Sequence, residues 1–151
     1  MPNTNCSASL KRYLHDQTNK LIDALRTAIK SGKVRDEDYP KVSIACEFSN
    51  HRAYGHSYKC HSSIKKKVTF VIPLQKALSF YGNPPTVKKD PVSGKVLFVG
   101  TCAEDFAANE VLEKSLTSRM YPKLNSLVFT EPIRTRTRQR MKFCDVCKAI
   151  F

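Results

Sequence analysis

Two cysteine motifs lie far apart in the chain and constrain its fold more than any other feature. The first motif carries Cys102 and Glu104, and the second is a Cys-x-x-Cys pair, Cys144 and Cys147, close to the end of the 151 residues. Tetrahedral zinc takes four ligands, so three thiolates leave one position open for water or substrate, and an open position is typical of catalytic zinc. The sequence therefore predicts that Cys102, Cys144 and Cys147 hold one Zn²⁺ ion, with the Glu104 carboxyl beside it.

The spacing within each motif suits a single metal ion. Cys144 and Cys147 stand at positions i and i+3, on one helical face, and two sulfurs at about 2.3 Å from one zinc lie roughly 3.8 Å apart. Glu104 is turned about 200° from Cys102 on a regular helix, so both reach one metal only from the first turn. There the free N–H groups and the helix dipole also favour thiolate over thiol. The sequence indicates such a start, with a strand over 95–100 before the motif and an apolar helical stripe after it, at Ala107, Val111 and Leu112.

The first motif resembles the core helix of the cytidine deaminase superfamily. The residues that carry this resemblance are Gly100, Thr101, Cys102, Ala103 and Glu104, followed by Ala107, Ala108, Asn109 and Leu112. The second motif, with Asp145 and Val146 inside it and Phe151 soon after, is most similar to the bacterial toxin-type (YwqJ-like) branch. That branch edits or damages nucleobases. Phe143 stands where the superfamily usually has a proline.

The resemblance implies both a fold and a reaction. The fold is a three-layer α/β/α cytidine deaminase-like sandwich with a mixed central sheet and zinc at two helix N-termini. The reaction is zinc-dependent hydrolysis of a C–N amidine bond, most simply cytosine to uracil in single-stranded or flipped nucleic acid, with Glu104 as the general acid and base. Substrate contacts are expected from Phe48, Tyr54, His56, Ser57 and Ala103. An immunity protein is a further partner implied by the resemblance.

Three alternatives stay open at the level of sequence. The substrate can be adenine, or a free nucleoside, instead of a cytosine within a polynucleotide. The chain can be a non-enzymatic, zinc-stabilised nucleic-acid-binding module. It can also be a deaminase fold that has lost activity. Release of ammonia or uracil from nucleic acid would separate an active deaminase from the binding module and from the inactive fold.

Composition bounds the remaining possibilities. With 26 Lys and Arg against 13 Asp and Glu, the net charge of +13 favours a polyanionic partner, nucleic acid ahead of an acidic membrane surface. No run approaches the roughly 18 apolar residues of a membrane span, and the N-terminus has no secretion signal. We therefore expect a soluble chain with no membrane partner, cytoplasmic or delivered into a target cell's cytoplasm. Its length and 41% hydrophobic content suit one domain, 1–151.

The hydrophobic pattern predicts alternating helices and strands, which favours an α/β layered sheet. An N-terminal helix is expected over about 7–31, ending at Gly32, before a core over about 42–151. The expected strands within that core are 42–48, 53–59 as the second arm of a hairpin, 68–72, 95–100 and 127–130.

A basic segment lies just before the second cysteine motif. Arg134, Arg136 and Arg138 alternate with threonines, so in an extended chain these arginines share one face. Such a face suits contacts to nucleic-acid phosphates. An edge strand protected by charge is an equally good interpretation of the same pattern.

Overall fold

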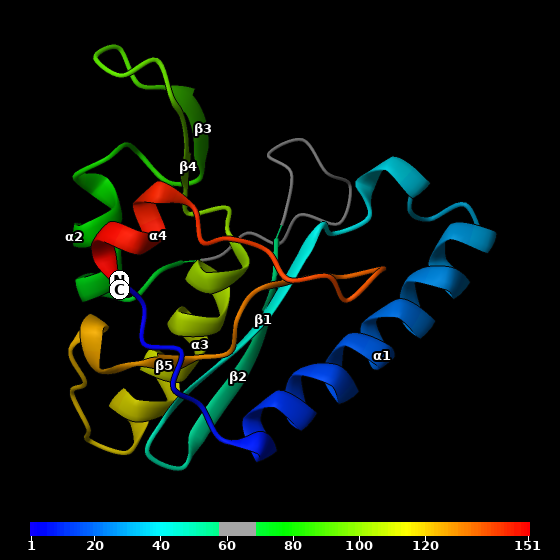
Figure 1. Cartoon of the computed structure of the whole chain (residues 1–151), viewed down its shortest axis with the longest axis horizontal. Helices are drawn as coiled ribbons and strands as arrows, with labels where there is room; N and C mark the ends of the chain where they lie inside the picture. Colours follow the sequence, from blue (N-terminus) through cyan, green and yellow to red (C-terminus); the bar gives the residue numbers. More distant parts are fainter. Residues whose placement is uncertain (58–68) are drawn as a thin grey trace.

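The computed structural model describes residues 1–57 and 69–151 (Figure 1). The fold is mixed α/β, with helices and antiparallel sheets. The elements are α1 (Ala8–Lys30), β1 (Val42–Phe48), β2 (His51–His56), α2 (Ile72–Ser79), β3 (Thr86–Lys89), β4 (Val96–Val99), α3 (Ala103–Thr117), β5 (Val128–Phe129), β6 (Ile133–Arg134) and α4 (Asp145–Ile150), with short 3₁₀ turns at Asp36–Asp38 and Leu124–Ser126. None of the helices in the described part of the chain has the length and apolar character of a membrane span.

Helix α1 begins and ends within one residue of its predicted bounds. The Ser7 side chain caps its start by accepting a hydrogen bond of 3.1 Å from the Leu10 N–H. The helix ends at Lys30, and Gly32 follows with φ +75°, a conformation that glycine adopts without strain. Leu10, Leu14 and Leu25 form its buried stripe, so the 3.6-residue period is sufficient to locate this helix.

Strand β1 lies at the centre of the main sheet. It pairs with β2 along one edge, and with both β5 and β6 along the other. Phe129 pairs with Cys46, and Ile133 pairs with Ser43. The segment from Phe129 to Ile133 is therefore one residue longer than the segment of β1 that it faces, Ser43 to Cys46. The extra residue is a β-bulge, in a segment that also contains Pro132. All pairings between the named strands are antiparallel, whereas the resemblance implies a mixed sheet. Among the described residues, parallel pairing is confined to one isolated bridge, Asn3 to Val128.

Helices α1 and α3 pack against opposite faces of this sheet (Figure 1). Successive side chains of β1 point to opposite faces, as in any strand. The core on the α1 face contains Leu10, Leu14, Ala45 and Ile133. The core on the α3 face is larger and includes Ile44, Cys46, Ala107, Val111 and Phe129. The cysteine motifs belong to the α3 side, because Cys102, Cys144 and Cys147 all join this second core.

Gly55 of β2 sets how closely α3 approaches the sheet. A Cβ atom at this position would lie 2.2 Å from the Ala103 carbonyl oxygen and 2.6 Å from the Ala107 nitrogen. Only glycine allows the helix backbone to come this close to the strand. The contact fixes the first turn of α3, where the first cysteine motif lies.

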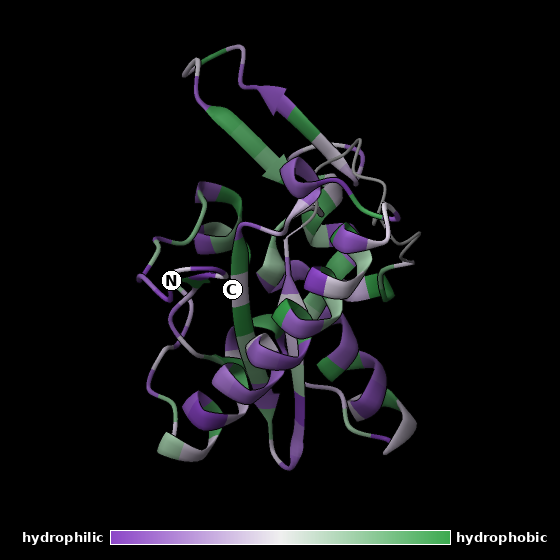
Figure 2. Ribbon diagram, turned by 90° about the vertical axis from the view of Figure 1, so that its right-hand side faces the viewer, coloured by the Kyte–Doolittle hydropathy of each residue, from purple (hydrophilic) through white to green (hydrophobic). Residues whose placement is uncertain are grey.

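The predicted strand over 68–72 is wrong in its described part. Residues 69–71 have no strand pairing, and Ile72 begins α2, with Pro73 in the first turn, where a missing N–H is harmless. Residue 68 lies outside the described residues, as does the end of the predicted arm 53–59. The chain then forms a separate two-stranded hairpin of β3 and β4, which projects from the body of the molecule (Figures 1 and 2).

Candidate metal centre

The two cysteine motifs meet in space. Cys102 is the N-cap residue of α3, Cys144 is the N-cap residue of α4, and Cys147 lies inside α4. Their three sulfur atoms all lie within 4.8 Å of one another, and the Cys102 and Cys144 sulfurs are 3.2 Å apart. We refer to Cys102, Cys144 and Cys147 as the cysteine cluster. Its members can hold a metal ion, and the all-sulfur ligand set is compatible with zinc.

Aromatic packing brings α4 to the start of α3. The Phe129 ring of β5 packs edge-on against Phe143, with ring centroids 6.3 Å apart, and against Phe151 at 5.0 Å. Val146 is 1% exposed between these residues and the rest of the core. The second motif is therefore anchored on both sides by buried side chains, which explains how residues separated by more than forty positions share one site.

The three cysteines of the cluster differ in the pKa of their side chains. Hydrogen bonds from the Cys102 and Cys147 side chains lower the pKa of Cys144 to about 3, and the Cys147 backbone N–H adds to this effect. The pKa of Cys102 is raised well above the usual value, chiefly because its proton is held in the bond to Cys144. Burial raises the pKa of Cys147. A metal cation that displaces the protons of Cys102 and Cys147 could therefore be bound by all three sulfur atoms.

Glu104 lies on the first turn of α3 and is 3% exposed. Burial, with a smaller contribution from the negative charge on Cys144, raises its pKa to about 7. A carboxyl with this pKa can both accept and donate a proton near neutral pH. Its side chain lines the same cavity as Cys102 and Cys144.

Asp105 is a site residue that the motif analysis missed. It is fully buried, and its carboxylate accepts a 3.2 Å hydrogen bond from the Cys102 N–H and a 3.9 Å contact from the Cys147 thiol. Burial raises its pKa well above the usual value, and Glu104 and Cys144 add to the effect. One carboxyl thus connects the two motifs. The signal was present in the sequence, because an N-cap residue followed by an acid at N3 is a capping-box pattern.

A cavity of about 930 Å³ opens beside the cluster. Two of the predicted substrate residues, Ser57 and Ala103, line it together with Cys102, Glu104 and Cys144. The Ser57 hydroxyl also accepts hydrogen bonds from the backbone N–H groups of Lys41 and Val42, at 3.2 and 3.0 Å. Lys41 and Lys142 contribute positive charge to the lining. The volume lies within the roughly 300–1,000 Å³ of ordinary ligand sites.

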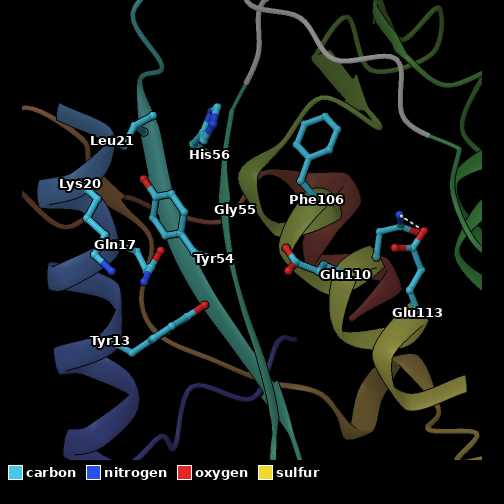
Figure 3. A pocket seen from close by; sticks show the side chains of 11 residues that line it. Tyr13, Gln17, Lys20, Leu21, Tyr54, Gly55, His56, Phe106, Glu110 and Glu113 are labelled. Atoms are coloured by element: carbon cyan, nitrogen blue, oxygen red, sulfur yellow. Dashed lines mark hydrogen bonds between the residues drawn. The ribbon is translucent and has the colours of Figure 1, made fainter. Parts of the chain in front are cut away.

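The other predicted substrate residues lie elsewhere. Tyr54 and His56 line a second cavity of about 720 Å³, between α1 and α3 at the β2 edge (Figure 3). The Tyr54 hydroxyl is hydrogen-bonded to the Ser43 hydroxyl at 2.6 Å on the α1 face. Phe48 is on the α3 face of the sheet, but it lies at the opposite end of β1 from Val42, which lines the cavity beside the cysteine cluster. We refer to the cavity beside the cysteine cluster as the cysteine cavity. Phe48 lines neither cavity. The substrate contacts expected for Phe48, Tyr54 and His56 have no support from these positions.

The three arginines do not form a common face. The chain turns sharply after β6, with the Arg134 N–H bonded to the Gln139 carbonyl at 2.7 Å, so 134–140 is not an extended strand. Arg136 stacks on the Tyr39 ring at 3.9 Å and pairs with Asp36 at 2.7 Å. Arg138 is hydrogen-bonded to His15 and Asn19 of α1.

The chain matches no protein-family model, no curated protein and no solved structure. The site itself consists of a cluster of cysteines suited to a metal ion and a buried carboxyl of raised pKa that lines the same cavity.

Proposed function

We propose that the chain is a zinc-dependent deaminase of nucleobases, with cytosine as its first substrate. The observation that carries this proposal is the shared cavity of Glu104, Cys102 and Cys144, the last two belonging to the cysteine cluster. A structural zinc site has no need of a cavity or of a buried, titrating acid beside its ligands. Within this proposal, the helices on both faces of the sheet correspond to a three-layer deaminase-like sandwich with zinc at the starts of α3 and α4.

Cys102, Cys144 and Cys147 would hold the zinc ion. Their sulfurs lie within 4.8 Å of one another, with the Cys102–Cys144 pair at 3.2 Å, close to the roughly 3.8 Å that one tetrahedral zinc ion requires. When bound, zinc lowers the pKa of a coordinated water to about 7 and so supplies a nucleophile at neutral pH. Asp105 holds the two motifs together through the Cys102 N–H and the Cys147 thiol.

Glu104 would carry the protons of the reaction. Its carboxylate would accept one proton from the attacking water and give it to the ring nitrogen, while the water oxygen bonds to the amine-bearing carbon. It would then take the second proton from the hydroxyl on that carbon and pass it to the amine, so that the C–N bond breaks, the carbonyl forms and ammonia leaves. A pKa of about 7 suits both halves of this cycle, because the protonated and ionised forms are then equally accessible at neutral pH. The surrounding core keeps the carboxyl out of bulk water.

The charge of the chain favours a polynucleotide over a free nucleoside. Lys41 and Lys142 line the cavity, and the net charge is +13. Lysines neutralise phosphates without reading sequence. The amine of cytosine is paired inside a duplex, so the substrate strand must be single-stranded or flipped.

The test is incubation of the zinc-loaded protein with single- and double-stranded DNA and RNA, and with free cytidine, followed by sequencing and product analysis. C-to-U changes in single strands would support the proposal. A-to-I changes would show that the substrate is adenine and not cytosine. Zinc-loaded protein that binds these nucleic acids but releases neither uracil, inosine nor ammonia would favour the non-enzymatic binding module.

A further inference from the structure

We propose that the outer face of the β3–β4 hairpin is a docking wall for a single-stranded polynucleotide, with Phe98 stacking on a base that flanks the one in the cavity. The outer face consists of Val87, Lys89, Val96 and Phe98. The proposal rests on the function proposed above and extends it by assigning a substrate class to a particular surface.

The register of the hairpin places these side chains together. Val87 pairs with Phe98 and Lys89 with Val96, and alternate positions of a strand share a face. Val87 is 42% exposed, Phe98 42% and Val96 55%. The opposite face carries Leu97, which packs on the core, and Val99, which is fully buried. The hairpin thus turns one apolar face inward and leaves a second one in solvent.

This outer face is continuous with the cysteine cavity. Val87 and Phe98 line the cavity together with Cys102 and Glu104, while Val96, at the other end of β4 from Val99, does not line it. A strand whose target base enters the cavity therefore has its next base beside Phe98. Stacking on an aromatic side chain is how single strands are held without sequence preference, since every base has an apolar face.

The surrounding charges select a nucleic acid over a second copy of the chain. Lys89 belongs to the outer face itself, and Lys41 and Lys142 line the cavity below it. The acids nearby are engaged: Asp90 bonds to the Val92 and Ser93 N–H groups in the hairpin tip, and Asp145 pairs with Lys95 at 3.8 Å. Two copies, each with a net charge of +13, would repel one another at such a contact.

The experiment measures binding of a fluorescein-labelled single-stranded oligonucleotide to zinc-loaded protein by anisotropy. We expect Phe98→Ala to weaken binding about five- to a hundredfold, the range for loss of one stacked base, with an unchanged salt slope. Phe98→Tyr should retain the affinity because it keeps the ring. The matched control is Phe80→Ala, which removes another exposed phenylalanine, 84% accessible at the end of α2, and should change nothing.

Several outcomes would overturn the inference. They are equal affinities of Phe98→Ala and wild type, equal losses in Phe98→Ala and Phe80→Ala, and no measurable single-strand binding by wild type. Deamination of free cytidine as efficiently as of the oligonucleotide would overturn it while leaving the proposed function intact. Conversely, binding that depends on Phe98 without any deamination would support the docking wall and contradict the proposed function.

Discussion

Asp105 is a buried residue that links the two halves of the candidate site. Its carboxylate reaches the Cys102 N–H at the start of α3 and the Cys147 thiol of α4. Buried polar groups that orient metal ligands commonly change metal affinity when they are removed. Asp105 is therefore expected to position the cysteine cluster without contacting the substrate.

Replacing Asp105 by alanine should weaken the site and the fold together. The variant leaves the Cys102 N–H without its acceptor, so the free energy of unfolding should fall by about 1–3 kcal/mol, and zinc affinity by about 10–100-fold. Urea denaturation and chelator competition measure the two effects. Glu110→Ala is the control, since Glu110 is a half-exposed acid of the same helix. Equal behaviour of the two variants would remove Asp105 from the site.

Single residues also show what the sequence could predict of the site. Residue type and local spacing were sufficient to predict that Cys102, Cys144 and Cys147 lie together, because thiolates at such spacing are typical ligands of one metal ion. The catalytic role of Glu104 stays a prediction. Tyr54 and His56 were predicted to contact the substrate, but they line the second cavity and not the one beside the cysteine cluster. Gly55, between them, faces α3, and strand alternation alone turns both neighbours toward α1. The choice of face depends on tertiary packing, which the local pattern leaves open.

At the scale of elements, the contact between β2 and α3 determines where the first motif lies. Gly55→Ala would place a Cβ 2.2 Å from the Ala103 carbonyl oxygen, next to Cys102. We expect a loss of about 1–3 kcal/mol of stability from this overpacking, together with reduced zinc occupancy, measured by thermal melts and metal analysis. Gly82→Ala is the control, because its nearest neighbours are flexible side-chain atoms at 3.2–3.5 Å. Unchanged zinc content in Gly55→Ala would contradict this view of α3.

Sequence reasoning missed α2 and β3, which lie between β2 and α3, and the short strand β6 with the turn that follows it. Residues 68–72 alternate like a strand, yet helix α2 forms because Pro73 suits a first turn and Leu74 and Leu78 bury one helical face. In the basic segment, Thr135 is fully buried and hydrogen-bonded to Ser43 at 2.9 Å, which commits the chain to a turn. Both departures come from long-range packing that overrides a short alternating pattern.

At the scale of the whole molecule, metal binding is expected to depend on pH. Cys102 and Cys147 have raised pKa values and so carry protons near neutral pH, whereas Cys144, with a pKa of about 3, is already a thiolate. Zinc binds thiolates, so binding must release the protons of Cys102 and Cys147, and affinity rises with pH. The logarithm of the apparent association constant should increase by about two per pH unit between about pH 6 and 8.

The Glu104→Gln background is suitable for this titration, because it removes the other group that titrates near pH 7 in the cavity. Competition with a chelator of known proton affinity gives the slope. A slope near three would mean that all of the cluster's thiols are protonated before zinc arrives, and a slope near zero would mean that the metal is not bound by thiolates.

The most direct measurement of the central claim compares wild type with Glu104→Gln on one cytosine-containing single strand, after both have been shown to carry the same zinc content. Glutamine keeps the size and hydrogen bonding of the side chain but cannot move a proton. The account predicts that uracil formation falls by about 10²–10⁴-fold while zinc content and melting temperature stay unchanged. Equal rates of uracil formation by the two proteins, or no uracil from either, would contradict it.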